Sequence, residues 1–167
     1  MDFKHSESQS SYNNSESSRK EYVVREIELF NSFIRDADVK RSKFKEMGHS
    51  PFAFYRATAH LFYRDIFHSV IPIPPEWKST PKISTWIQGD LHLKNFGFFD
   101  NDKGEIKFDI NDFDESYIAP FYWDIIRFTI GIFLIRKLVE DFNLSNSESE
   151  DIIDEFIDEY KEMLKEI

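Results

Sequence analysis

The sequence predicts an α+β fold that is mostly helical and carries a small β-hairpin near its middle. Apolar residues recur at intervals of three and four in several separate stretches, which is the pattern of helices with one buried face. Two short apolar runs, F-G-F-F and E-I-K-F, flank the turn-forming residues D-N-D-K-G, as in a hairpin. At 167 residues the chain is long enough for a core, and we expect one domain over residues 19–167.

The composition excludes several classes of protein. The formal net charge is −10 and the basic residues are scattered, so no nucleic-acid partner is expected. No apolar run is as long as a membrane span and no signal peptide is visible, so we expect a soluble cytoplasmic protein. The absence of cysteine excludes disulfides, thiolate metal sites and a cysteine nucleophile. The 18 Phe and 7 Tyr imply large apolar surfaces, some of which could meet a missing segment or a second chain.

The first part of the chain predicts a tail and one or two helices. Residues 1–18 are rich in Ser, Asn and Glu and are expected to be disordered. An amphipathic helix is predicted over residues 19–34, since Tyr22, Val23, Ile27, Phe30, Phe33 and Ile34 form one apolar stripe. Residues 36–47 are charged and fit either a short exposed helix or a loop, with Gly48 as a stop.

A helix over residues 50–68 is predicted next, with Ser50 as N-cap and Pro51 at its first position. Its core face would hold Phe52, Tyr55, Ala59, Phe62 and Ile66. Arg56 and Arg64 lie on this helix, and each could bind phosphate or form a surface salt bridge; the second alternative is favoured for Arg64. His60 and His68 have no partner at ligand spacing and are interpreted as structural.

The remaining elements follow from local patterns. The prolines of residues 71–77 predict a connector, and residues 82–87 a short strand. The hairpin is predicted over residues 96–99 and 105–110, and a buried helix over residues 121–142. A capping box of Ser147 and Glu150 would begin the last helix. Its buried stripe would comprise Ile152, Ile153, Phe156, Ile157, Tyr160, Met163 and Leu164.

Polar and acidic residues crowd the stretch from Trp86 to Asp124. Asp90, His92 and Asn95 lie before the hairpin, and three acids follow it: Asp109, Asp112 and Asp114. Carboxylates held close together repel unless a cation lies between them, and Mg²⁺ prefers oxygen ligands. A metal site is therefore predicted, whereas Asp100 and Asp102 are interpreted as hairpin-turn residues.

Two linked motifs in this stretch resemble known proteins. Q-G-D-L-H-L-K-N-F-G is similar to the catalytic loop of the aminoglycoside phosphotransferase and choline kinase-like branch of the protein-kinase fold, and N-D-F-D-E-S-Y-I-A-P-F-Y-W-D-I-I to its acidic segment. Together with S-P-F-A-F-Y-R, these motifs resemble the bacterial family catalogued as domain of unknown function 2252, over roughly Lys43 to Leu138. The resemblance implies the C-terminal lobe of a kinase-like fold.

The resemblance also implies roles for individual residues. Asp90 matches the base that accepts a proton from a substrate hydroxyl. Asn95 and Asp112 match the Mg²⁺ ligands, and Asp114 is either a second carboxylate ligand or a turn cap. In supporting roles, His92 would orient the loop and Asp124 would accept hydrogen bonds from loop amides.

Two departures from the kinase pattern limit the transfer of mechanism. Gln88 stands where the phosphotransferases have His, and the five glycines form no phosphate-binding loop. ATP or another nucleotide would therefore need a continuation or second chain that supplies a glycine-rich lobe. The leading hypothesis is phosphoryl transfer to an unknown small molecule with that lobe present. The alternatives are a non-catalytic, pseudokinase-like binding module and, ranked last, metal-dependent phosphoester hydrolysis.

Overall fold

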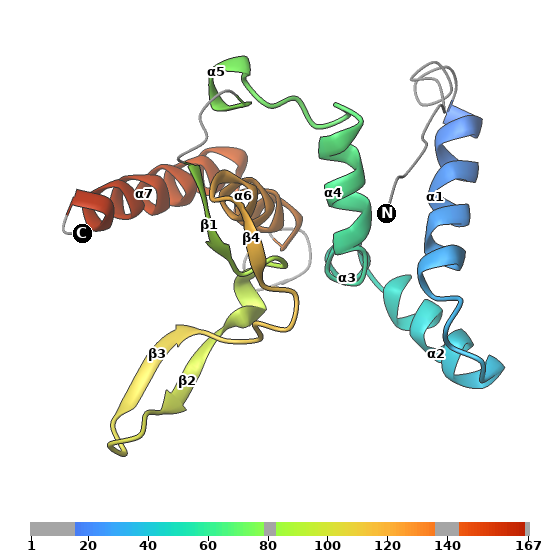
Figure 1. The fold of residues 1–167 in the computed structure, drawn as a ribbon, viewed down its shortest axis with the longest axis horizontal. Coiled ribbons are helices and arrows are strands. Elements are labelled where there is room, and N and C mark those ends of the chain that lie inside the picture. Colours follow the sequence, from blue (N-terminus) through green and yellow to red (C-terminus); the bar gives the residue numbers. More distant parts are fainter. Residues whose placement is uncertain (1–15, 79–82, 136–143, 166–167) are drawn as a thin grey trace. The chain divides into compact units, whose positions relative to one another are not determined.

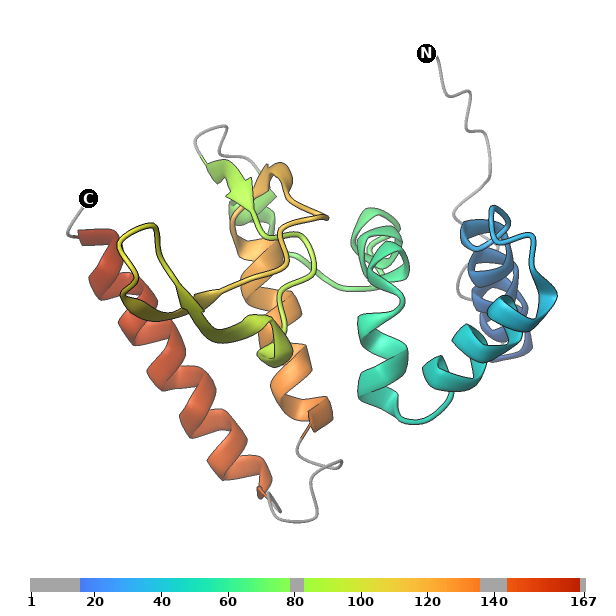
Figure 2. The ribbon, with the colours of Figure 1, turned by 90° about the horizontal axis from the view of Figure 1, so that it is seen from below.

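The computed structural model describes residues 16–78, 83–135 and 144–165 (Figures 1 and 2). Helices dominate and two small antiparallel sheets accompany them, which confirms the predicted α+β, mostly helical class. The chain divides into two compact units. The first comprises Met1–Gly48 with Ala57–Thr80, and the second His49–Arg56 with Pro81–Ile167. One domain over residues 19–167 stays a prediction. Of the predicted tail, residues 1–15 lie outside the described residues, and the prediction is wrong for residues 16–18, which form the start of a helix.

The first unit contains α1 (Glu16–Phe30), α2 (Ala37–Met47), α4 (Ala59–Phe67) and α5 (Pro75–Lys78). Ion pairs join α1 to α4. Arg19 Nη1 donates to Asp65 Oδ1 at 2.8 Å, and Arg64 Nε lies 2.9 Å from Glu26 Oε2. The rings of Phe30 and His60 stack with centroids 3.8 Å apart. Arg64 therefore forms the salt bridge favoured for it, and His60 has a structural role.

Helix α1 ends four residues before the predicted boundary, residue 34. Asn31 is fully buried, and both its backbone N–H and its Nδ2 donate to the carbonyl of Ile27. The bond from the Asn31 N–H is a regular helical one, and the helix ends after it because the next bonds are tighter: Ser32 N donates to the carbonyl of Leu29, and Ile34 N to that of Asn31, each three residues back. The charged segment that follows forms helix rather than loop. Asp36 caps its N-terminus by accepting from Asp38 N, and Gly48 is its C-cap, as predicted.

The helix predicted over residues 50–68 is wrong after Arg56. The chain forms α3 (Pro51–Arg56), which Ser50 caps by accepting from Ala53 N at 3.0 Å, and then a separate α4. The carbonyl of Tyr55, which a continuous helix would pair with residue 59, accepts instead from Arg127 Nη2 at 3.0 Å. The predicted common core face is therefore divided between the two units.

The second unit holds both sheets and two long helices. β1 (Ser84–Ile87) pairs with β4 (Tyr117–Pro120), a strand that the sequence pattern did not reveal. β2 (Phe96–Asp100) and β3 (Ile106–Ile110) form the predicted hairpin. The prolines of the connector open the short α5 instead of excluding helix altogether. Within the described residues, no helix combines the length and apolar character needed to cross a membrane.

Helices α6 (Tyr122–Ile135) and α7 (Asn146–Lys165) complete this unit. Its core consists of Leu91, Phe128 and Ile132, packed against Phe96, Ile110, Ile153 and Phe156. The part of the predicted buried helix beyond residue 135, up to residue 142, lies outside the described residues.

The capping box of α7 is two residues earlier than predicted. Ser145 Oγ accepts from Glu148 N at 3.2 Å, and Glu148 Oε2 accepts from Ser145 N at 2.8 Å. The run S-N-S-E-S-E fits the Ser-x-x-Glu pattern in both registers, and the pattern alone does not choose between them. Of the predicted stripe, Ile153, Ile157, Phe156 and Tyr160 are half-buried. Ile152, Met163 and Leu164 are exposed.

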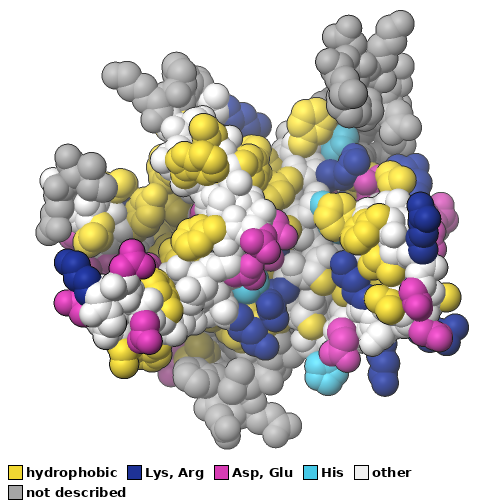
Figure 3. Space-filling model, turned by 60° about the horizontal axis from the view of Figure 1, so that its bottom comes forward, with side chains coloured by type: hydrophobic (Ala, Val, Ile, Leu, Met, Phe, Trp, Pro, Cys, Tyr) yellow, Lys and Arg dark blue, Asp and Glu magenta, His cyan; other side chains and the backbone are white. Residues whose placement is uncertain are grey.

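One face of the β2–β3 hairpin is apolar from base to tip. At the base, Phe96 and Ile110 pack against the core, but farther out Phe98, Ile106 and Phe108 are 76%, 71% and 60% exposed. The hairpin extends away from the rest of its unit (Figure 1), and hydrophobic side chains are visible at the surface in Figure 3. Much of the aromatic content is thus exposed rather than buried.

Candidate functional site

The site is built on the loop of residues 88–95, which follows β1. At its start, the carboxylate of Asp124, in the first turn of α6, accepts hydrogen bonds from the backbone N–H groups of Gln88 (2.6 Å) and Gly89 (3.1 Å). These are the contacts expected of Asp124. Desolvation raises the pKa of Asp124, and the two backbone donors oppose that rise. The loop is therefore anchored to α6 through its own backbone.

Gln88 joins the loop to the acidic segment, residues 109–115. Its side-chain Oε1 accepts from Asp90 N at 2.8 Å, and its Nε2 donates to the carbonyl of Asp112 at 2.5 Å. Gln88 is 5% exposed, so both bonds are shielded from water. Gln88, the residue that departs from the phosphotransferase pattern, thus bonds to the backbone of both the predicted base, Asp90, and the predicted metal ligand, Asp112.

Asn95 and Asp112, the two predicted ligands, are brought together through the backbone. The carbonyl of Asn95 accepts from Asn111 N at 2.7 Å, and the side-chain Oδ1 of Asn95 accepts from His92 N at 2.9 Å. Asp112 has φ +62°, an uncommon conformation for a residue other than glycine. Such conformations cluster at functional sites, where the surrounding structure holds them.

The two other acids of this segment differ in their contacts. Asp109 Oδ1 accepts from Ile110 N at 2.8 Å, so that carboxylate is engaged by its own neighbour. The carboxylates of Asp112 and Asp114 are exposed, and neither forms a hydrogen bond or ion pair within the described part of the chain. Asp112 and Asp114 therefore present unpaired carboxylates, whereas one carboxylate oxygen of Asp109 is already used by Ile110 N.

The donor set suits Mg²⁺. Carboxylate and amide oxygens are its preferred protein ligands, and the side-chain Oδ1 of Asn95 has a second lone pair beside the one that His92 N uses. Over residues 16–78, 83–135 and 144–165, no three His, Asp or Glu side chains gather closely enough to hold a metal by themselves. Mg²⁺ commonly completes such partial sets with water and substrate phosphates.

The carboxylate of Asp90 is bound by a residue that the sequence analysis did not assign to the site. Arg127 of α6 is fully buried, and its Nε donates to Asp90 Oδ1 at 2.7 Å while its Nη2 contacts the same oxygen. Its guanidinium also lies 4.3 Å above the ring of Tyr55, whose hydroxyl donates to the Arg127 carbonyl at 3.0 Å. One feature of the sequence could have indicated this contact: Arg127 is a cation in an otherwise apolar helix, one turn after Asp124. A cation buried in such a helix requires a negatively charged partner.

Burial controls the proton affinity of Asp90. Desolvation raises the pKa of Asp90 to about 6, the Arg127 guanidinium opposes that rise, and Glu115 adds to it. Because Arg127 occupies Oδ1, the second oxygen, Oδ2, is the one able to accept a substrate proton. A carboxylate with a pKa near 6 is ionised at neutral pH and is a stronger base than an exposed one.

His92 is buried at 2% exposure and is neutral. Its Nε2 accepts a hydrogen bond from Arg56 Nε at 2.9 Å, which requires an unprotonated nitrogen there. Desolvation lowers the pKa of His92 to about 4, and the positive charge of Arg56 lowers it further. His92 therefore connects the loop to α3, and Arg56 makes a contact that neither predicted role anticipated.

The His92 imidazole is expected to titrate near pH 4 in the folded chain, instead of near 6.5 as in an unfolded one. Because the pKa of His92 is lower in the folded state, its neutral form contributes to the free energy of unfolding, and this contribution is complete above about pH 6.5. It is lost, by about 3 kcal/mol in all, as the pH falls toward 4. NMR of the imidazole nitrogens measures the titration directly, which matters because the raised pKa of Asp90 acts on stability in the opposite direction.

The Arg56→Gln variant supplies the comparison. Removing that cation is expected to raise the pKa of His92, since Arg56 is the largest electrostatic cause of its depression. A wild-type titration midpoint near 6.5 would show that His92 is not buried in neutral form.

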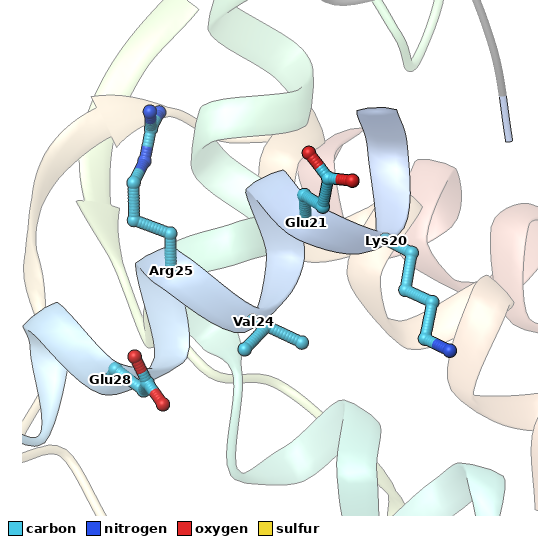
Figure 4. A pocket seen from close by; sticks show the side chains of 5 residues that line it. All are labelled: Lys20, Glu21, Val24, Arg25 and Glu28. Carbon is cyan, nitrogen blue, oxygen red and sulfur yellow. The ribbon is translucent and has the colours of Figure 1, made fainter. Parts of the chain in front are cut away.

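A surface pocket elsewhere on the molecule is not part of this site. It is lined by Lys20, Glu21, Val24, Arg25 and Glu28, all on α1 (Figure 4). Acidic and basic side chains alternate along one helix face, as on a solvated surface. No element other than α1 contributes to its lining, so it has no convergent polar groups.

Comparisons with known proteins identify one family. A family model described as "Uncharacterized protein conserved in bacteria (DUF2252)" matches residues 35–167. The match includes the whole 88–95 loop and the acidic segment, and leaves out all of α1. Neither the curated proteins nor the solved structures contain a significant match.

Proposed function

This chain belongs to the DUF2252 family of uncharacterised bacterial proteins, and from that premise we propose that it binds Mg²⁺ and takes part in phosphoryl transfer when a nucleotide-binding lobe is supplied. The lobe would come from a continuation of the chain or from a second protein. The acceptor is a small molecule with a hydroxyl group. Mg²⁺ would supply neutralisation of the phosphate charge in such a reaction.

The observation that carries the proposal is the joining of the 88–95 loop to the acidic segment. Asp124 holds the loop backbone, Gln88 bonds to both Asp90 and Asp112, and the Asn95 carbonyl accepts from Asn111 N–H. These bonds hold the segments that carry the proposed base and the two proposed oxygen ligands next to each other, which supports the proposal. The resemblance of these motifs to aminoglycoside phosphotransferases supports phosphoryl transfer as the chemistry.

Each residue has a definite task in this reaction. Asp90 Oδ2 would accept the proton of the substrate hydroxyl as the hydroxyl oxygen attacks the terminal phosphorus of the nucleotide, and the bond from that phosphorus to the departing nucleoside diphosphate breaks. Arg127 would keep the carboxylate ionised and correctly oriented. Asn95 and Asp112 would hold Mg²⁺, with Asp114 as a further ligand. The exposed hairpin residues Phe98, Ile106 and Phe108 support a missing partner, because apolar patches of this kind often mark interaction sites.

Mg²⁺ is expected to stabilise the chain weakly, and the Asp112→Ala variant is expected to abolish the effect. At a Mg²⁺ concentration about ten times the dissociation constant, binding adds about 1.4 kcal/mol to the free energy of unfolding. The measurement is the melting temperature across a millimolar Mg²⁺ titration.

Asp109→Ala is the matched control, because it removes a nearby carboxylate that bonds its own neighbour. This variant should keep the Mg²⁺ response. An equal response in Asp112→Ala and wild type would refute a metal site at Asp112.

One observation favours a second candidate, a non-catalytic binding module of pseudokinase type. The Asp90 carboxylate is half-buried and paired with Arg127, as a purely structural ion pair would be. This function predicts that a partner binds Asp90→Asn as tightly as wild type, provided that the variant folds. Phosphoryl transfer predicts that the same variant loses turnover in the complemented protein.

A further inference from the structure

We propose that Arg56, assisted by Lys94, forms a subsite for an anionic group of the substrate, a phosphate or a carboxylate, near Asp90. The location of this subsite relative to the chemistry rests on the proposed function. Its capacity to bind an anion does not, and can be tested without a metal or nucleotide.

The guanidinium of Arg56 is held in place rather than mobile. Arg56 ends α3 and is partly buried, and its Nε donates to Nε2 of the almost completely buried His92 at 2.9 Å. One bond at Nε fixes the plane of the guanidinium and leaves its two terminal nitrogens for another acceptor. A planar fork presented in this way matches the two oxygens of a carboxylate or phosphate.

The charge of Arg56 is left uncompensated because its partner is a neutral histidine. A carboxylate at the position of His92 would have oriented the guanidinium and cancelled its charge, whereas an unprotonated imidazole only orients it. Arg19, Arg64 and Arg127 each contact a carboxylate. Within the described ranges, by contrast, Arg56 has no ion-pair partner. Charges withdrawn from water are usually paired, so a partly buried cation without a counter-ion favours the binding of an anion.

The surrounding charges place this cation at the candidate site. Arg56 is close enough to Asp90 to lower the pKa of that carboxyl, and it acts on His92 together with Arg127 and Lys94. The charge of Arg127 is paired with the Asp90 carboxylate, so Arg56 and the exposed Lys94 are the cations that could attract an anion. Two acidic groups nearby oppose an anion: Asp90, whose Oδ2 lies 3.8 Å from His92 Nε2, and Glu115, which raises the pKa of Asp90. The ligand is therefore expected to bind through direct contacts with the guanidinium and not through a broad positive field.

In a phosphotransferase, the anionic group bound by Arg56 could come from either of two molecules. The anionic group could belong to the acceptor, which would then be a phosphorylated or carboxylated hydroxyl compound, or to the phosphates of the nucleotide. Both use the same fork of Arg56, and they are distinguished by testing glycerol 3-phosphate and ATP separately.

The experiment is a titration of the chain with inorganic phosphate in the absence of Mg²⁺. Binding is monitored by NMR, through the signals of the Arg56 Nε–H group and of the loop backbone. Wild type is expected to bind phosphate in the millimolar range. Arg56→Gln should weaken binding at least tenfold, and Lys94→Gln about threefold. Arg64→Gln is the control and should bind as wild type, because Arg64 is paired with Glu26.

Lys94→Gln alters an exposed side chain and keeps the test valid if Arg56→Gln disturbs the fold. Parallel titrations assign the source: Arg56→Gln weakens glycerol 3-phosphate if the subsite serves the acceptor, and ATP if it serves the nucleotide. The proposal is overturned if wild type does not bind phosphate, or if both Arg56→Gln and Lys94→Gln bind it as wild type does. Failure of the Mg²⁺ site is distinguishable from failure of this subsite. In that case Asp112→Ala and wild type respond equally to Mg²⁺ in melting temperature, while both still bind phosphate.

Discussion

Replacing Gly89 by alanine is expected to destabilise the second unit by about 4 kcal/mol or more. Gly89 has φ +90°, and a Cβ atom added there would lie 2.1 Å from the carbonyl oxygen of Glu115 and 2.7 Å from its carbonyl carbon. Both neighbours are backbone atoms, so relief requires that the acidic segment move away from the 88–95 loop. Urea unfolding followed by circular dichroism measures the loss.

Gly104→Ala is the matched control. Gly104 also has positive φ, at +72°, but nothing lies within 4 Å of its added Cβ. The control therefore reports only the conformational cost of alanine, about 1 kcal/mol. If the two variants lost equal stability, the close approach of Gly89 to Glu115 would be disproved, and with it the joining of loop and acidic segment.

The Arg127→Met substitution is expected to cost about 3–5 kcal/mol at neutral pH, the range observed when one member of a buried ion pair is removed. The methionine fills much of the volume but leaves the Asp90 carboxylate without its cation and the Tyr55 carbonyl without its donor. The free energy of unfolding, measured with urea at several pH values, gives the result.

The pH dependence tests the cause of this loss. Without Arg127 the pKa of Asp90 in the folded state should rise further above its unfolded value, since Arg127 is what lowers it. A raised folded pKa contributes stability at low pH that is lost as the pH rises through it. The deficit of the variant should therefore be smaller near pH 4 than at pH 7.

An exposed pair supplies the control for Arg127. Arg41 and Asp38 have side chains 79% and 90% exposed, and Arg41→Gln should change stability by about 0.5 kcal/mol or less. A loss of that small size for Arg127→Met would mean that Asp90 and Arg127 are not a buried pair. The double variant Asp90→Leu with Arg127→Met should recover part of the loss, because it leaves neither charge alone.

The local elements were largely predictable because their signals lie within a few residues. Ser50 and Pro51 begin α3 as expected, Gly48 ends α2, and D-N-D-K-G forms the hairpin turn. The strand β4 was missed because Y-I-A-P is short and has no alternation, and its only reason to be extended is its pairing with β1.

The composition of the candidate site was partly predictable. The resemblance assigned Asp124 to loop amides, and that contact is present. It did not reveal that Arg127 pairs with Asp90 or that Arg56 bonds to His92, because these partners are 37 and 36 residues apart in sequence. Contacts of that separation leave no periodic pattern.

The sequence by itself determined where most of the helices begin and where the β2–β3 hairpin turns, since caps, prolines and apolar spacing act over one or two turns. Only the tertiary structure decided that the helix predicted from Ser50 ends at Arg56, that Gln88 bonds to the acidic segment, and that a neutral His92 holds a charged Arg56. The physical reason is desolvation. A polar group taken out of water bonds to whichever partner the packed chain places beside it, and that choice is not encoded in its neighbours along the sequence.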